Sequence, residues 1–212
     1  MKLKTCLILG ASGLVGSNVL TALLADEHVA RVTVLVRKLL SVTHPKLIQV
    51  CTDFKDMSAL DSIGSIDVLY SCIGTTRKKT PDLIAYRAID YGITTAVAAL
   101  AKAKGCEEIH LVSSVGANAN SSNFYLKIKG EVELGIQALG FERCIIYRPS
   151  MLIGARNESR PAEKLGQLLT PIFDLFTFGG KYHSIHASRL AEVMCKYQDS
   201  NGTKIKSYPF KS

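Results

Sequence analysis

Apolar residues in this chain fall into short continuous runs, each of which ends at a polar residue or a glycine. Runs of this length, several of them rich in β-branched residues, are typical of buried strands. The predicted strands cover 6–9, 31–36, 47–51, 66–71, 109–113 and 144–147. The segments between and after them carry helix-forming residues, some bounded by Gly105 or Gly140 as a stop. The predicted helices run from the first glycine turn to about Ala25, then over 82–104, 124–139, 162–176 and 187–198.

Strands and helices therefore alternate along most of the chain. Continuous apolar strands that alternate with helices indicate a parallel sheet whose two faces are both covered. We predict an α/β fold with a doubly wound parallel sheet, built as a single domain over residues 1–212. The less regular residues 150–212 are expected to form a small helical cap on the substrate side. In such sheets ligands bind beyond the carboxyl ends of the strands.

The stretch Lys4–Gly16 has the spacing of a dinucleotide-binding turn between a strand and a helix. Gly10 permits the tight turn, Gly13 lets the backbone approach a pyrophosphate, and Gly16 lets the helix pack on the strand. The first amides of the helix lack internal partners and favour an anion. The alternative is a tight turn that binds nothing. The residues predicted to contact the cofactor here are Gly10, Ser12, Gly13, Leu14, Val15 and Gly16, with Ile73 and Gly74 after a later strand.

The residue that ends the second strand indicates which dinucleotide binds. An acidic residue there accepts a hydrogen bond from the 2′-hydroxyl of NAD, whereas an arginine accommodates the 2′-phosphate of NADP. Arg37 ends this strand and Lys38 follows it, so we predict NADP(H). A surface cation without a ligand is the alternative for Arg37. Asp53, after the third strand, is placed to accept from the adenine amino group, or else forms only a turn.

Tyr125 and Lys129 form the only Tyr-x-x-x-Lys pair in the chain and begin a predicted helix, so both point the same way. A tyrosine's ordinary pKa of about 10 is too high for proton transfer at neutral pH, and a neighbouring ammonium favours the phenolate. A serine that ends the preceding strand can hold a substrate carbonyl. Ser114 is preferred over Ser113, although both remain candidates. The alternative is an aromatic residue packed on a helix beside a solvated lysine.

Composition and charge narrow the class of protein. Apolar residues make up 47% and charged residues 21%, which suits a globular domain with a small-molecule substrate and no membrane span. The net charge of +8 is not gathered into a stripe, so specific nucleic-acid binding is not expected. The six cysteines are scattered, which predicts no metal site and a cytoplasmic location.

These residues together resemble the short-chain dehydrogenase/reductase superfamily. The GASGLVG turn, with two residues between glycines, is similar to its extended and atypical branches, as are Tyr147–Gly154 and His183–His186. The stretches Cys72–Arg77, Ser121–Leu126 with Lys129–Glu133, and Arg156–Pro161 resemble most closely the group of Tat-interacting oxidoreductases.

The resemblance implies a Rossmann fold, NADP(H) binding and the Ser-Tyr-Lys set named above, and it allows a homodimer. It also implies that Leu152 and Arg160 lie near the cofactor. The expected activity is that of an NADP(H)-dependent oxidoreductase acting on a small carbonyl or alcohol. A regulator that binds NADPH without turnover is the alternative.

Overall fold

The structure, a computed structural model, describes residues 3–61, 63–154, 184–196 and 201–207. Its main sheet has seven strands, and every pair of neighbouring strands is parallel. The strand order is β3-β2-β1-β4-β5-β6-β9, so the chain crosses over between β1 and β4. The strands are β1 (Lys4–Leu9), β2 (Val29–Val36), β3 (Leu47–Cys51), β4 (Val68–Ser71), β5 (Glu108–Val112), β6 (Arg143–Arg148) and β9 (Gly202–Ser207).

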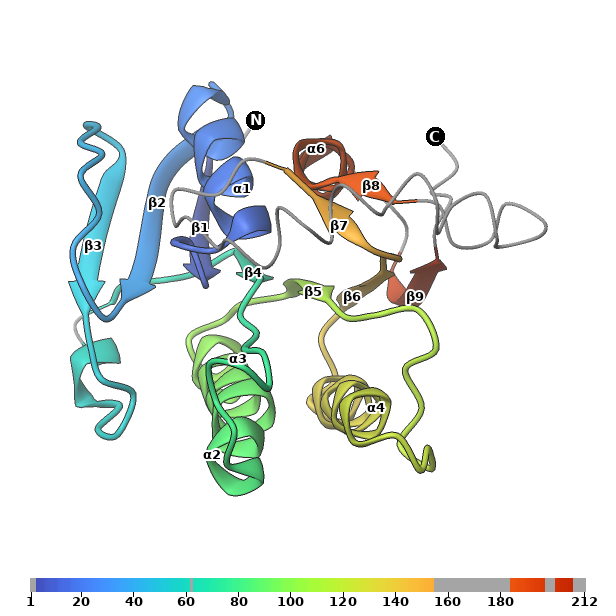
Figure 1. Ribbon diagram of the computed structural model, residues 1–212. Helices are drawn as coiled ribbons and strands as arrows, with labels where there is room; N and C mark the ends of the chain where they lie inside the picture. Colours follow the sequence, from blue (N-terminus) through green and yellow to red (C-terminus); the bar gives the residue numbers. More distant parts are fainter. Residues whose placement is uncertain (1–2, 62, 155–183, 197–200, 208–212) are drawn as a thin grey trace.

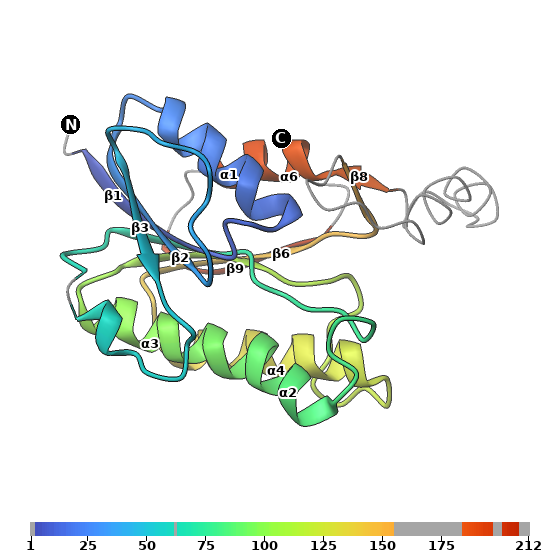
Figure 2. The ribbon, with the colours of Figure 1, turned by 60° about the vertical axis from the view of Figure 1, so that its left-hand side comes forward.

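Helices cover both faces of this sheet, as Figures 1 and 2 show. On one face lie α1 (Leu14–Ala25) and α6 (Ala187–Lys196), and on the other lie α2 (Leu83–Arg87), α3 (Thr94–Ala103) and α4 (Phe124–Ala138). The buried apolar side chains divide into two clusters, one on each face. The three-layer α/β fold with a parallel sheet is therefore confirmed.

The strand β1 lies inside the sheet, between β2 and β4, and its last four residues are buried. Leu9 pairs with Leu35 of β2 on one side and with Ser71 of β4 on the other. The carboxyl ends of these strands therefore meet at one edge, at the point where the strand order reverses. Ligand sites in open α/β sheets form at such a reversal.

The predicted helix over 82–104 is observed as α2, a π-helical turn η2 (Ala88–Ile93) and α3. Asp82 begins α2, and its side chain accepts a hydrogen bond from the amide of Ala85 at 2.7 Å. By length and composition alone, the stretch Leu83–Ala103 could cross a membrane. It nevertheless buries Tyr86 and the charged Asp90 against the rest of the fold, as a helix that covers a sheet does.

The last part of the chain departs most from the sequence prediction. The helix expected over 187–198 is observed as α6, which packs beside α1, and the helix expected over 162–176 lies outside the described residues. Three strands were not predicted: the edge strand β9, and the short pair β7 (Leu152–Ile153) and β8 (Ile185–His186). The sheet is thus one strand wider than expected.

Candidate functional site

The turn after β1 is closed by contacts that only glycine permits. Gly10 has a φ of +88°, and a Cβ atom on it would lie 2.7 Å from the carbonyl carbon of Cys72. A Cβ atom on Gly16 would lie 2.2 Å from the carbonyl oxygen of Gly10, so helix and turn pack backbone to backbone. Gly13 begins α1, which has no side-chain cap and no acidic residue in its first turn. The turn has the geometry that the predicted diphosphate site at residues 10–16 requires, and the contacts themselves stay a prediction.

Arg37 and Lys38 follow directly after β2, and both side chains are exposed. Because Leu35 lies opposite Leu9, Arg37 stands next to the start of the glycine turn. The two cations are therefore on the side of the turn where the adenosine ribose of a bound dinucleotide would lie.

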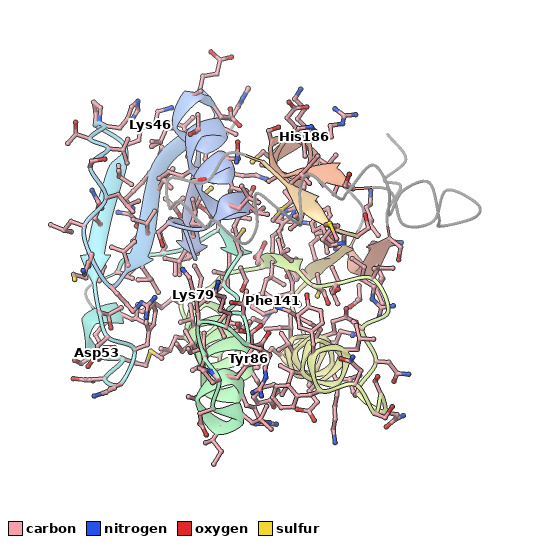
Figure 3. The ribbon with its side chains drawn as sticks, in the orientation of Figure 1. Lys46, Asp53, Lys79, Tyr86, Phe141 and His186 are labelled. Carbon is pink, nitrogen blue, oxygen red and sulfur yellow. The ribbon has the colours of Figure 1, made fainter. Side chains whose placement is uncertain are left out.

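Asp53 lies beyond the carboxyl end of β3, at the opposite end of that strand from Lys46 (Figure 3). Its side chain accepts a hydrogen bond from the amide of Lys55 at 2.9 Å. This contact is that of a turn-forming aspartate, the alternative named in the sequence analysis. Phe54 next to it has a φ of +63°, which is unusual for a bulky residue.

Lys129 is buried on α4 and forms an ion pair with Asp90 of η2, with Nζ 2.9 Å from Oδ1. The chain at Gly74 passes over this pair, since a Cβ atom there would be 3.5 Å from Nζ and 3.6 Å from Oδ1. Burial opposes the charged form of Lys129, but the Asp90 carboxylate, together with Tyr125 and Glu133, outweighs it, so the pKa of Lys129 is raised above its usual value.

Tyr125 stands one turn before Lys129 and is 40% exposed. The Lys129 ammonium lies 6.0 Å from the centroid of the Tyr125 ring. The predicted pair is therefore brought together at the start of α4, with the lysine inside and the phenol facing outward. Asn123 fixes this end of the helix, because its side chain accepts from the amide of Leu126 at 3.2 Å.

The two candidate serines have different environments. Ser113 is buried, and its hydroxyl donates a hydrogen bond to Glu133 of α4, which also binds Arg148 through both carboxylate oxygens. Ser114 is half-buried, and among the described residues its hydroxyl donates to the carbonyl oxygen of Val115 at 3.2 Å. Ser113 is thus committed to a buried network, whereas the Ser114 hydroxyl has a local partner that a substrate could replace.

Of the remaining predicted residues, Ile73 and Leu152 lie in or after strands that the structure describes. Ile73 follows β4, and its backbone approaches Gly10. Leu152 lies in β7, and the neighbouring Gly154 approaches the side chain of Leu14 in the first turn of α1. Arg160 lies outside the described residues.

With this geometry established, comparison with known proteins gives the family. A family model described as NAD(P)H-binding matches residues 10–147, from the glycine turn to the end of β6. This chain belongs to the NAD(P)H-binding family.

Relatives of this NAD(P)H-binding chain cover most of its length. Protein HTATIP2 of Rattus norvegicus is 36% identical over 171 residues, which span 79% of this chain and 70% of that protein. Protein fmp52-1, mitochondrial, of Aspergillus terreus is 36% identical over 185 residues, which span 84% of this chain and 76% of that protein. The resemblance to Tat-interacting proteins is confirmed, but the expected cytoplasmic location is contradicted, because the fungal relatives are named as mitochondrial proteins.

Solved structures share the fold at low sequence identity. A UDP-N-acetylglucosamine 4-epimerase from Methanobrevibacter ruminantium in complex with UDP-N-acetylmuramic acid has a TM-score of 0.72 at 18% identity, over 97% of this chain and 76% of its own. The Bordetella bronchiseptica enzyme WbmH in complex with NAD+ has a TM-score of 0.73 at 18% identity, over 97% and 75%. The NAD(P)H-binding chain therefore shares its fold with these two enzymes.

The sequence analysis missed Asp90, the buried partner of Lys129. The two residues are far apart along the chain, and an aspartate inside an apolar helix has no recognisable spacing to a lysine on another helix. A weak signal was present, since an acidic residue in a predicted core helix needs a buried partner.

Proposed function

We propose that this protein is an NADP(H)-dependent oxidoreductase that transfers hydride to or from a small carbonyl or alcohol substrate. The observation that carries the proposal is the Tyr125–Lys129 pair at the start of α4, where Lys129 is approached by Gly74 of the segment after β4. The glycine turn follows β1, and Gly74, which approaches Lys129, follows β4; the strand order reverses between these two strands.

The residues that would hold the cofactor are those of the glycine turn, with Arg37 and Lys38 beside the 2′-phosphate. The nicotinamide ring supplies a hydride for reduction or accepts one during oxidation. An exposed guanidinium forms charge-assisted hydrogen bonds with a phosphate, which supports NADP(H) over NAD(H).

The roles of the other side chains follow from their environments. The Ser114 hydroxyl would donate to the carbonyl oxygen of the substrate, and the exposed Tyr125 phenol would give that oxygen its proton during reduction. In the oxidative direction Tyr125 would take the proton back as hydride leaves the alcohol carbon. Lys129 stays charged below the phenol, where its positive charge favours the phenolate that remains.

The experiment compares the wild type with Tyr125→Phe, using NADPH and NADH with a panel of small aldehydes and ketones. We expect Tyr125→Phe to lose turnover by about 100-fold or more, because it removes the proton donor. Its dissociation constant for NADPH should stay within about threefold of the wild type. Tyr91→Phe is the matched control, because it removes the hydroxyl of a tyrosine in η2 and leaves Tyr125 in place. It should keep its turnover.

Binding of the two cofactors is measured in the same samples by calorimetric titration. NADPH should bind the wild type at least about tenfold more tightly than NADH at low salt, since one charge-assisted contact gives that much. Equal affinities would contradict the NADP(H) assignment, and no binding of either would remove the whole proposal.

A regulator that binds NADPH without turnover is the second candidate. The observation in its favour is that the charge of Lys129 is already matched by Asp90, which weakens the effect of the ammonium on its surroundings. In that case the wild type and Tyr125→Phe would bind NADPH alike, and neither would turn over any carbonyl in the panel.

A further inference from the structure

Asp90 occupies an unusual place in the fold. Its side chain has no exposed surface, and it sits in the π-helical turn η2 between α2 and α3. Such turns are uncommon and are frequently found at functional sites. A charged group this deep in the fold needs partners that compensate for lost hydration.

The two oxygens of the Asp90 carboxylate have different partners. Oδ1 lies 2.9 Å from Nζ of Lys129, and Oδ2 accepts a hydrogen bond from the amide of Thr75 at 2.8 Å. Thr75 is held from the other side as well, because the hydroxyl of Tyr86 donates to its carbonyl oxygen at 3.1 Å. One carboxylate thus joins α4 to the chain that leaves β4.

The other charged and titratable groups near Lys129 come from three elements. Tyr125 and Glu133 stand one turn before and one turn after it on α4, and Arg148 of β6 neutralises Glu133. Tyr86 of α2 lies near Asp90, and burial raises the pKa of its phenol above the usual value. Because Glu133 is already paired with Arg148, Asp90 is the group that compensates the Lys129 charge directly.

We propose that Asp90 is the positioning residue of this site, and that its carboxylate keeps the Lys129 ammonium charged and fixed below Gly74 and Tyr125. The assignment of a reaction to Lys129 rests on the proposed function, but the effect of Asp90 on the charge of Lys129 does not. Without the carboxylate, burial would favour the neutral amine of Lys129.

Three variants separate charge from shape. Asp90→Asn keeps an acceptor for the amide of Thr75 and removes the negative charge, whereas Asp90→Ala removes both. Asp61→Asn is the matched control, because it makes the same substitution at an exposed aspartate. The charge of Lys129 is followed in lysine labelled with ¹³C at Cε, with its resonance assigned from Lys129→Arg.

We expect the Lys129 resonance of the wild type to titrate at higher pH than those of exposed lysines. In Asp90→Asn it should titrate about 1–3 pH units lower than in the wild type, while Asp61→Asn leaves it unchanged. If Asp90→Asn does not fold, the wild-type titration alone decides, and a Lys129 that titrates below the exposed lysines overturns the proposal. An unchanged titration in a folded Asp90→Asn would also overturn it.

Turnover distinguishes this proposal from the proposed function. In an active enzyme, Asp90→Asn should lower kcat about 10–100-fold and move the loss of activity at high pH to lower pH. A purely structural ion pair would instead lower the melting temperature and leave the shape of the pH profile as it was. If Lys129 titrates lower in Asp90→Asn but neither protein turns over a carbonyl, Asp90 keeps its assigned role and the oxidoreductase proposal fails.

Discussion

Two neighbouring serines show how strongly a single residue's role depends on its surroundings. Side chains of successive residues in an extended chain point to opposite sides. Ser113 points to Glu133 and is buried, while Ser114 is half-buried with its hydroxyl near the carbonyl oxygen of Val115. A residue next to a candidate catalytic group can therefore be structural even when the two have the same side chain.

Alanine at each serine should give opposite effects on turnover and stability. Ser114→Ala removes a donor to the substrate oxygen, so we expect kcat to fall about 100-fold with an unchanged melting temperature. Ser113→Ala leaves the buried Glu133 carboxylate with Arg148 alone and should cost about 1–3 kcal/mol of unfolding free energy. Steady-state kinetics and urea unfolding measure the two effects, and a larger loss of kcat in Ser113→Ala would reverse the assignment.

At the scale of single residues, the sequence predicts a contact best when the two residues are close together along the chain. Tyr125 and Lys129 are one helical turn apart, so their proximity follows from helix geometry. The choice between the serines depends on Glu133 and Arg148, and the partner of Lys129 is Asp90 on another helix. These contacts depend on how helices pack over the sheet, which no spacing within one segment encodes.

At the scale of elements, α4 is held against the segment that leaves β5. The amide of Asn118 donates to the carbonyl oxygen of Leu126 at 3.0 Å. A Cβ atom on Gly130 would lie 2.1 Å from the amide nitrogen of Ala119. Helix and segment therefore meet backbone to backbone at Gly130, so we expect a change at this contact to shift Ser114, which lies on the same segment, relative to Tyr125 on the helix.

Gly130→Ala should push the segment away from the helix. Because the obstructing atoms belong to the backbone, we expect a loss of about 1–3 kcal/mol in unfolding free energy. Turnover should fall further than stability explains, since Ser114 would move. Gly92→Ala is the control, because a Cβ atom there would meet nothing within 4 Å. It should be neutral or gain up to about 1 kcal/mol, and equal losses in both variants would contradict the explanation.

The strands and helices that were predicted well are those with a clear apolar pattern. The predicted strand 47–51 is observed as Leu47–Cys51, and the predicted helix 124–139 as Phe124–Ala138. The edge strand β9 was missed because its residues are mostly polar and exposed. Its pairing with β6 comes from backbone hydrogen bonds at the sheet edge, which require no apolar side chains.

At the scale of the whole molecule, a polar network crosses the sheet away from the candidate site. His110 of β5 is fully buried and stacks between the rings of Tyr70 on β4 and Tyr147 on β6. One ring nitrogen lies 2.9 Å from the Tyr147 hydroxyl and the other lies 2.7 Å from Glu108. Arg143 and Lys4 also reach Glu108, at 3.1 and 3.5 Å. Together these contacts connect β1, β4, β5 and β6.

This network should make the stability of the fold sensitive to acid. Burial lowers the pKa of His110 below 6.5, so the folded ring is neutral while the unfolded ring takes up a proton as pH falls below that value. Burial alone would raise the pKa of Glu108, but His110, Lys4 and Arg143 lower it to about 2. The ionised Glu108 therefore stabilises the fold above its unfolded pKa of 4.5, and this contribution is lost as pH falls from 4.5 towards 2.

Both groups act in the same direction, so the unfolding free energy should decline steadily below about pH 6.5. Glu108→Gln should lower the unfolding free energy by about 1–3 kcal/mol at pH 7, because it removes the negative charge that His110, Arg143 and Lys4 contact. It should also flatten the pH dependence between 4.5 and 2, since the titrating carboxylate is gone. Glu107→Gln changes an exposed neighbour and should leave both properties unchanged. Urea unfolding of the three proteins across this pH range tests the idea, and it fails if the two variants lose acid sensitivity equally.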